Sequence, residues 1–376
     1  MNEYKNLKEL LYRLNVNSKY DIDLLRSAFS EILNVKNDNI RNTMLGSFLT
    51  AIMTKNPTSD EVVALLKEAF SLDNYNPIER KKIQIDNHEI VTLAGSGKKG
   101  VKTINISTAS ALLASSMGAY VVKPGSKSTS SVTGSADFME IVGANKDITL
   151  DESIDILNDC GFAFFCIEDI IPKFDKIYGG NFFAPHVLSF GLAALICPVK
   201  TDSLLYGLAH PNVELSLDVL KKFGNQNVLV VSSTDDGIHF IDEMGVYGET
   251  KIIGTKDGIN NGNLLIFNPI KELGLPKYTS RDIAQGKTKE ENIKYILSVL
   301  AGNGLEAHED IVCINCANIL YLSRMVTNYK EGYVKAKEAI KTGQGLDMLI
   351  KYIKHTGGNT NKIYKLLGEK HAKDFL

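Results

Sequence analysis

A stretch rich in glycine and lysine, residues 93–131, holds the residue types most able to do chemistry in this chain of 376 residues. Gly95, Gly97 and Gly100 are spaced as G-x-G-x-x-G, and no Asp or Glu occurs between residues 90 and 136. The lysines of the same region are Lys98, Lys99, Lys102, Lys123 and Lys127. Glycine loops bring backbone N–H groups close to an anion, and ammonium groups neutralise phosphate charge. The pattern predicts a polyanion site, and a solvated lysine-rich turn is the alternative.

Two common nucleotide-binding fingerprints do not fit this stretch. A dinucleotide site requires an acid about 20 residues after the glycine loop, but the first acid here is Asp137. A P-loop requires G-x-x-x-x-G-K-[ST], whereas residues 95–102 end in G-V-K. The expected ligand is therefore a phosphate-rich molecule other than a nucleotide bound in either of these ways.

Small polar residues reinforce the phosphate interpretation in two places. At the start of a predicted helix, where hydroxyl and amide groups cap the helix or contact phosphate oxygens, lie Thr103, Asn105, Ser107 and Thr108. A second loop about twenty residues later repeats this chemistry with Lys123, Ser126, Lys127, Ser128, Ser130 and Ser131. Helix capping explains two or three of these residues, but it does not explain two such loops.

The elements that must position these loops follow from hydrophobic periodicity. Residues 1–72 contain four stretches with apolar residues at helical spacing, the last beginning with Ser59 or Thr58 as its cap. After a connection at residues 73–82, β-rich runs alternate with helical stretches, which is typical of βαβ units around a mostly parallel sheet. We therefore expect an α/β fold, with a helical domain at 1–72 and a larger α/β domain at 80–376.

Composition narrows the class of protein. The formal net charge of −2 argues against a protein that binds nucleic acid through a basic surface. The most apolar run, residues 186–199, is too short to span a bilayer and is expected to form a core helix or strand. The first residues show no signal-peptide pattern, so we expect a cytoplasmic location. The cysteines fit buried thiols better than metal or redox sites, including the C-x-x-C pair, and are Cys160, Cys166, Cys197, Cys313 and Cys316.

The two loops together resemble the signature of anthranilate phosphoribosyltransferases. That signature runs G-T-G-G-D-G, T-F-N-I-S-T, K-H-G-N-R-S-x-S-S and G-S-A-D, and the similarity extends over about residues 5–352. It implies a homodimeric glycosyltransferase related to tryptophan biosynthesis, with a small helical domain on an α/β domain of the nucleoside-phosphorylase type. A segment around residues 168–195 would join the helical domain. Phosphoribosyl pyrophosphate (PRPP) with Mg²⁺ would be the donor, and an acceptor would displace its pyrophosphate at the anomeric carbon.

The resemblance also implies roles for individual residues. Pyrophosphate would be wrapped by Gly95, Ser96 and Gly97, with Lys98 and Lys99 in the same loop. Phosphate and metal would be held by Thr103, Asn105, Ser107, Thr108 and Lys123, and the second phosphate loop would contain Ser126, Lys127, Ser130 and Ser131. Lys99 stands where the signature has its aspartate, so it would either neutralise pyrophosphate in place of a metal or clash with that metal.

The acceptor side departs further from the family pattern. Glu168 and Asp169 replace a His-His pair, and Gly180 or Asn181 falls where an arginine would bind the acceptor's carboxylate. This predicts an altered acceptor, neutral or amine-bearing, in a pocket with Glu168, Asn181 and His186. A solvated loop at 168–169 and a packed or surface His186 are the plainer alternatives.

The family's second group of metal ligands, an Asp-Glu pair, can be aligned with this sequence in two ways. With a two-residue insertion, the family's Asp-Glu metal ligands fall on Asp242 and Glu243, which would join Ser107; without it they fall on His239 and Phe240, and the site is lost. We favour the first alignment.

The alternative to an enzyme is a non-catalytic relative that binds nucleic acid through the lysine-rich groove.

Overall fold

The computed structural model describes residues 4–128, 132–182, 184–255 and 262–368. Its helices, in chain order, are α1 (Lys5–Asn15), α2 (Ile22–Leu33), α3 (Asp38–Thr54), α4 (Ser59–Ser71), α5 (Ile106–Ser116), α6 (Ser135–Val142), α7 (Leu150–Cys160), α8 (Ile167–Ile170), α9 (Pro172–Tyr178), the 3₁₀ helix η1 (Val187–Phe190), α10 (Leu192–Leu195), α11 (Val213–Lys222), α12 (Pro269–Leu273), α13 (Lys289–Leu300), α14 (Glu306–Leu322), α15 (Tyr329–Lys341), α16 (Gln344–His355) and α17 (Asn361–Leu367). The strands are β1 (Lys81–Lys82), β2 (Ile90–Gly95), β3 (Tyr120–Gly125), β4 (Phe162–Cys166), β5 (Val199–Lys200), β6 (Ser203–Gly207), β7 (Asn227–Thr234), β8 (Glu249–Gly254) and β9 (Leu265–Phe267).

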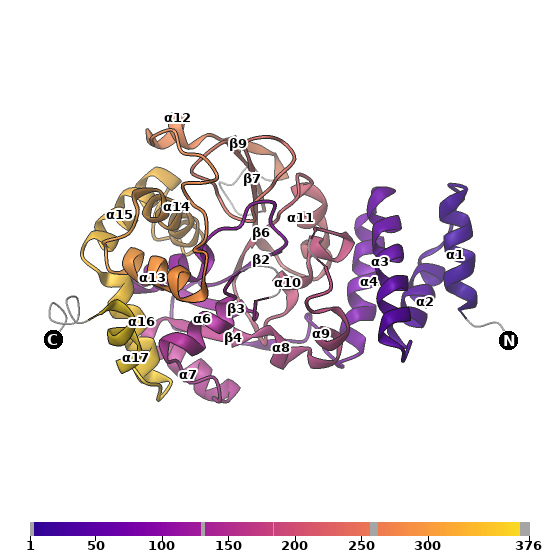
Figure 1. Ribbon diagram of the computed structural model, residues 1–376, viewed down its shortest axis with the longest axis horizontal. Coiled ribbons are helices and arrows are strands. Elements are labelled where there is room, and N and C mark those ends of the chain that lie inside the picture. The colour runs from indigo at the N-terminus through magenta and orange to yellow at the C-terminus, as the bar shows by residue number, and fades with distance from the viewer. Residues whose placement is uncertain (1–3, 129–131, 183, 256–261, 369–376) are drawn as a thin grey trace.

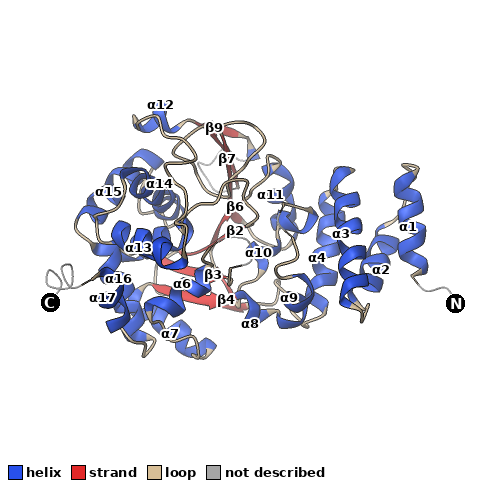
Figure 2. Ribbon diagram, in the orientation of Figure 1, coloured by secondary structure: helices blue, strands red, loops and turns tan. Residues whose placement is uncertain are grey.

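Seven of these strands form one mixed sheet in the order β4-β3-β2-β6-β7-β8-β9. The first five run parallel to one another, β8 is antiparallel to β7, and β9 is antiparallel to β8. Figure 2 shows the sheet between helices on both sides. Parallel strands place their carboxyl ends at one edge, so the loops after β2, β3 and β6 meet there. The predicted α/β class with a mostly parallel sheet is confirmed.

The side chains of the central strands point alternately into two hydrophobic cores, one on each face of the sheet. In β7, Leu229 and Val231 face one hydrophobic cluster, whereas Val228 and Val230 face the other. Successive side chains of a strand point to opposite faces, so the apolar run at residues 228–231 must be covered on both sides. One cover is formed by α5 and α13–α16, and the other by α11 with the N-terminal helices.

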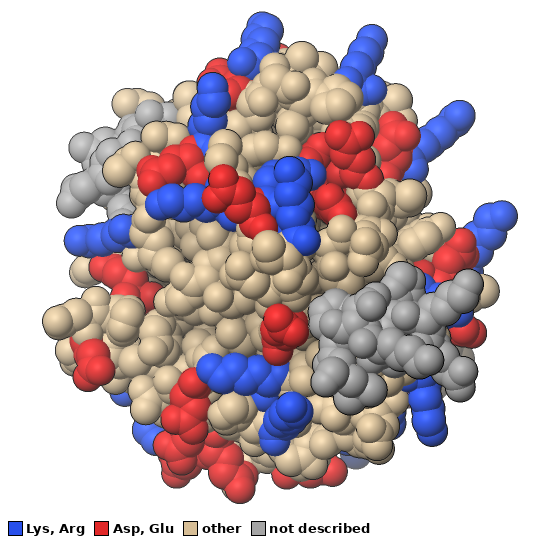
Figure 3. All heavy atoms as spheres, turned by 90° about the vertical axis from the view of Figure 1, so that its left-hand side faces the viewer, with Lys and Arg blue, Asp and Glu red and all other residues tan. Residues whose placement is uncertain are grey.

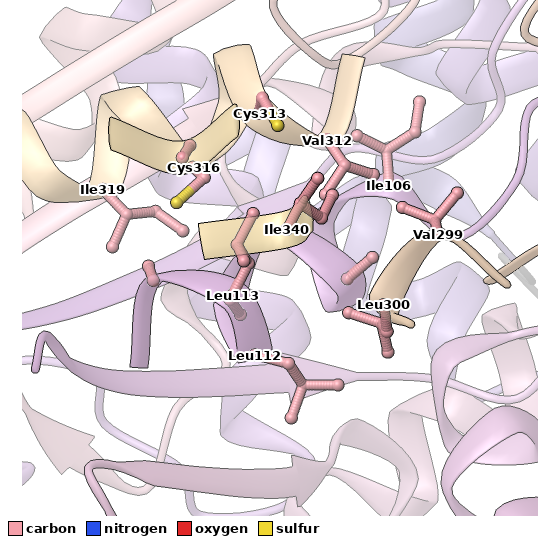
Figure 4. Packing of buried hydrophobic residues seen from close by; sticks show 14 of the residues in the cluster. Ile106, Leu112, Leu113, Val299, Leu300, Val312, Cys313, Cys316, Ile319 and Ile340 are labelled. Carbon is pink, nitrogen blue, oxygen red and sulfur yellow. The ribbon is translucent and has the colours of Figure 1, made fainter. Parts of the chain in front are cut away.

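The first of these cores is centred on α5. Leu113 of α5 belongs to the same buried cluster as Cys313 and Cys316 of α14 and Ile340 of α15 (Figure 4). The two sulfur atoms lie in apolar surroundings, and burial raises the pKa of both thiols. Their expected role as packed thiols is thus confirmed; of the remaining cysteines, Cys166 alone is half-exposed rather than buried.

The helices α1–α4 lie together at one end of the molecule (Figure 1). Thr58 is the N-cap of α4: its hydroxyl accepts from Glu61 N, and the Glu61 carboxylate accepts from Thr58 N. This reciprocal pair satisfies two otherwise unpaired amides at the helix start. The four helices share one core with η1, α9 and α10, which is the neighbourhood expected for the segment around residues 168–195.

Two features differ from the sequence expectation. The sequence pattern does not predict strand β6, although it lies at the centre of the sheet between β2 and β7. The apolar run at residues 186–199 forms η1, α10 and the first residue of β5 rather than one helix or strand.

No helix among the described residues is both long enough and apolar enough to cross a membrane.

Candidate functional site

A cavity of about 240 Å³ lies at the carboxyl edge of the parallel strands. It is bounded by the loop after β2, the loop after β3, the turn at residues 242–243 and the segment from α8 to α10. All five lysines singled out in the sequence line it: Lys98, Lys99, Lys102, Lys123 and Lys127. The fold therefore gathers the predicted phosphate-binding residues in one place and adds a wall that the sequence pattern did not reveal.

The first glycine loop is shaped by Asp242. Gly97 has a φ of 65°, and its N–H donates to Asp242 Oδ2 at 2.8 Å. A Cβ at Gly95 would collide with the same carboxylate, so glycine is needed there for close approach. Lys98 also has a positive φ, 57°, which is uncommon for a residue with a side chain and recurs at functional sites.

Lys99 lies between the two acids of the turn. Its Nζ is 2.5 Å from Glu243 Oε1 and 3.2 Å from Asp242 Oδ1, and it donates to Thr103 Oγ1 at 2.8 Å. Burial alone would lower the pKa of Lys99, but the charges of Asp242 and Glu243 outweigh burial and raise it. Burial and the neighbouring Asp242 charge raise the pKa of Glu243. The favoured alignment is the one that the fold supports, because Asp242 and Glu243 line the cavity, whereas His239 is exposed and pairs with Asp236.

Lys123 supplies a second buried cation. Lys123 is only 3% exposed, and its Nζ donates to Pro124 O at 2.7 Å, which leaves two of its three N–H donors without a protein acceptor among the described contacts. Burial lowers the pKa of Lys123 to about 8. An ammonium with unused donors in a cavity is suited to binding an anion.

The start of α5 faces the same space. Ser107 and Thr108 line the cavity, and Thr108 Oγ1 is buried without a hydrogen-bond partner in the described part of the chain. Asn105 does not cap the helix with its side chain; instead its Oδ1 accepts from Asn292 Nδ2 at 3.1 Å. The partial positive charge of a helix N-terminus adds to that of the lysines.

The second loop is ordered by two carboxylates. Glu168 Oε1 accepts from Lys127 N at 2.7 Å, and Asp137 Oδ2 accepts from the amides of Ser128 and Gly134 at 2.7 and 2.9 Å. Ser126 lines the cavity together with Lys127. The predicted residues Ser130 and Ser131 lie outside the described residues.

The opposite wall is apolar and aromatic. Tyr178 stacks on Phe174 with ring centroids 5.1 Å apart and contacts Phe182 at 5.3 Å. The wall is completed by Ile167, Ile171, Leu192, Ala193, Ile196 and Tyr206. A flat aromatic ligand can stack on such a surface. The sequence analysis missed these residues, although the spacing of Phe174, Tyr178 and Phe182 by four residues was visible.

One lysine of the glycine loop reaches this aromatic wall. Lys98 Nζ donates to Tyr178 Oη at 2.9 Å, and Tyr178 Oη is also 2.7 Å from His186 Nε2. Burial, aided by the Lys98 charge, lowers the pKa of His186, so the imidazole is neutral. Its Nδ1 accepts from Leu188 N, which leaves the proton on Nε2 to be donated to Tyr178.

Of the three residues predicted for the acceptor pocket, one lines the cavity and two do not. Glu168 lines the cavity, but it is engaged by the second loop and by Cys166 Sγ at 2.9 Å. Asn181 is exposed, donates to Ile177 O and is not part of the lining. His186 is buried behind Tyr178, because its ring caps η1 and supports the tyrosine hydroxyl. The prediction that Asn181 and His186 line the acceptor pocket is therefore wrong.

Comparisons with known proteins show which family this chain is similar to. Residues 87–346 match the family model described as "Glycosyl transferase family, a/b domain". An anthranilate phosphoribosyltransferase from Methanococcoides burtonii is 30% identical over 344 residues, which cover 90% of this chain and 92% of the relative. One from Colwellia psychrerythraea is 29% identical over 358 residues, covering 93% of this chain and 90% of that relative.

Solved structures show the same fold. The crystal structure of anthranilate phosphoribosyltransferase from Thermus thermophilus has a TM-score of 0.72 at 19% identity, covering 95% of this chain and all of that one. The enzyme from Saccharomyces cerevisiae in complex with PRPP and Mg also has a TM-score of 0.72, at 20% identity and 93% and 98% coverage. The resemblance seen in the two glycine and serine loops thus extends over nearly the whole molecule. This chain belongs to the anthranilate phosphoribosyltransferase family, whose members are glycosyltransferases.

Proposed function

We propose that this protein transfers the phosphoribosyl group of PRPP to the amino nitrogen of anthranilate or a closely similar aromatic amine. The observation that carries the proposal is the cavity itself, which joins a lysine-rich end to an aromatic wall. In the reaction, the bond from the anomeric carbon to pyrophosphate breaks, a bond from the amine nitrogen to that carbon forms, and the amine loses a proton. The relatives named above carry the same activity in their names.

The donor end contributes charge and position rather than covalent chemistry. Lys123 and the start of α5 would hold the phosphates, and the lysines would stabilise the negative charge that develops on the departing pyrophosphate. Groups fixed in a cavity before the reaction stabilise such charge without rearranging. They also hold donor and acceptor in line, which lowers the entropic part of the barrier.

The acceptor end offers two donors for a carboxylate. The Tyr178 oxygen accepts from Lys98 and from His186, so the tyrosine's own proton is left to bind a ligand, and no acceptor for it is found among the described contacts. No arginine lines the cavity among the described residues. The Lys98 ammonium and the Tyr178 hydroxyl together would bind an acceptor's carboxylate in its place. This removes the reason for expecting an acceptor without a carboxylate.

Mg²⁺ is present with PRPP in the yeast relative, and we propose that it accompanies PRPP here as well. The Ser107 hydroxyl lines the cavity at the start of α5 and has the hard oxygen that Mg²⁺ prefers. When bound, the metal would neutralise part of the negative charge of the pyrophosphate. Asp242 and Glu243 do not fit this role, because they already hold the Lys99 ammonium.

The test of the function is a pair of measurements on the purified protein. Calorimetric titration with PRPP, with and without Mg²⁺, should give saturable binding. Adding anthranilate should then give PRPP-dependent loss of anthranilate fluorescence as the amine is converted. Binding of PRPP without turnover of anthranilate would redirect the search to other aromatic amines, and no binding at roughly 100 μM would overturn the proposal.

The nucleic-acid alternative finds no support in the relatives, which are named as phosphoribosyltransferases. On the face shown in Figure 3, lysine and arginine side chains are interspersed with Asp and Glu rather than gathered in one patch. A basic patch or stripe is what such binding requires. The division into domains at 1–72 and 80–376 and the homodimer stay predictions, which limited proteolysis and light scattering would check.

A further inference from the structure

We propose that the Lys99 ammonium is the resident cation of the Asp242–Glu243 pair, so that these carboxylates bind no divalent metal ion. The proposal rests on the proposed function in that PRPP is the ligand expected beside this pair. It concerns how the site is neutralised, and it follows from the positions of three side chains.

The ammonium is held by three oxygen atoms. Its Nζ donates to Glu243 Oε1 at 2.5 Å and to Thr103 Oγ1 at 2.8 Å, and it lies 3.2 Å from Asp242 Oδ1 as an ion pair. The Lys99 side chain is 18% exposed, and those of Asp242 and Glu243 are 2% and 5% exposed. A lysine held in this way is a structural cation rather than a mobile surface charge.

The backbone holds Lys99 in this position. On one side, Gly97 N donates to Asp242 Oδ2 at 2.8 Å; on the other, Gly100 N donates to Phe240 O at 2.9 Å. A side chain at Gly100 would collide with the backbone of His239, so the loop and the turn are packed closely together. Lys99 therefore lies on the turn that carries the acids, and moving it away requires the loop to separate from that turn.

The ammonium excludes a metal from the same oxygens. Mg²⁺ binds oxygen at about 2.0–2.1 Å in near-octahedral geometry, so an ion on these carboxylates would lie within a few ångströms of the lysine nitrogen. Like charges at that distance in a buried site repel strongly. No group of three or more His, Cys, Asp or Glu side chains that could hold a metal is found in the described part of the chain.

The sequence departs from the family signature at the same point. Lys99 stands where the signature G-T-G-G-D-G has its aspartate. Replacing an acid by a base next to two carboxylates makes the local charge more positive by two units. This is the change in charge that a bound metal ion would otherwise supply. The substitution and the geometry thus agree.

The test counts bound Mn²⁺ by its electron paramagnetic resonance signal, first without PRPP and then with saturating PRPP. Without PRPP, wild type and Asp242→Asn should bind Mn²⁺ equally weakly. Lys99→Gln, which keeps hydrogen-bonding capacity but removes the charge, should gain a site at least ~10-fold tighter because the repulsion is gone. Lys341→Gln removes the charge of an exposed lysine at the end of α15; it is the control and should resemble wild type.

A Mn²⁺ site present in wild type and lost in Asp242→Asn or Glu243→Gln would overturn the proposal, and this comparison needs no variant of Lys99 to fold. With PRPP, the number of added Mn²⁺ ions should be the same in wild type and Asp242→Asn. A larger number in wild type would mean that PRPP displaces Lys99, which also overturns it. If PRPP does not bind at all, the proposed function fails, while the metal-only measurement still decides the role of Lys99.

Discussion

Lys98 Nζ and Tyr178 Oη are 2.9 Å apart, and this hydrogen bond joins the glycine loop after β2 to helix α9. The two residues therefore connect the donor end of the cavity to its acceptor wall. Lys98→Met should raise the KM for anthranilate by ~10–100-fold, because a hydrogen bond to a charged group contributes about 1.5–3 kcal/mol. Steady-state kinetics would measure this effect.

Tyr178→Phe provides the matched comparison for the same prediction. It keeps the ring that stacks on Phe174 and removes only the hydroxyl, so a smaller rise in KM is expected. The dissociation constant for PRPP should change little in both variants. A loss confined to PRPP affinity would place Lys98 on the phosphate instead.

Lys123→Ala should weaken PRPP binding by ~10-fold or more, because a buried ammonium with unused donors is lost. The folded protein should lose little stability, since removing a buried charge also removes its desolvation cost and this offsets the lost packing of the lysine stem. Calorimetry and thermal unfolding would measure the two effects. Lys341→Ala, an exposed residue at the end of α15, is the control and should alter neither.

PRPP binding should take up protons near pH 8. Burial lowers the pKa of Lys123 to about 8, so this ammonium is partly deprotonated there. A bound polyanion favours the charged ammonium and raises its pKa, so affinity should fall as pH rises through 8. Calorimetry in buffers of different ionisation enthalpy would measure the uptake, which should shrink in Lys123→Ala. An observed enthalpy independent of buffer would contradict the prediction.

Gly95→Ala should destabilise the protein and impair PRPP binding. The added methyl group would collide with the Asp242 carboxylate, and overpacking of this kind costs about 1–3 kcal/mol. Gly46→Ala is the matched control: no atom lies within 4 Å of its added Cβ, and it lies inside α3. Because alanine favours helix, it should stabilise by about 0.5–1 kcal/mol. Urea unfolding of both variants would measure the difference.

The fold class and much of the donor site could be predicted from the sequence. The apolar run at 90–95, the glycines and the polar helix start at 103–108 carry their information locally, so strand, loop and helix followed from neighbouring residues. The strand β6 could not be recognised in this way, because a short apolar run does not distinguish a buried strand from a piece of buried helix. Its central place depends on pairing with β2 and β7.

The sequence by itself determined which residues carry charge near the glycine loop and which family signature they resemble. Only the tertiary structure decided what those charges contact. Lys99 and Glu243 are 144 positions apart, and Lys98 and Tyr178 are 80 apart, so no local periodicity relates them. They meet because parallel strands bring the loops at their carboxyl ends to one edge of the sheet. One lysine thereby meets two carboxylates, and its neighbour meets an aromatic wall.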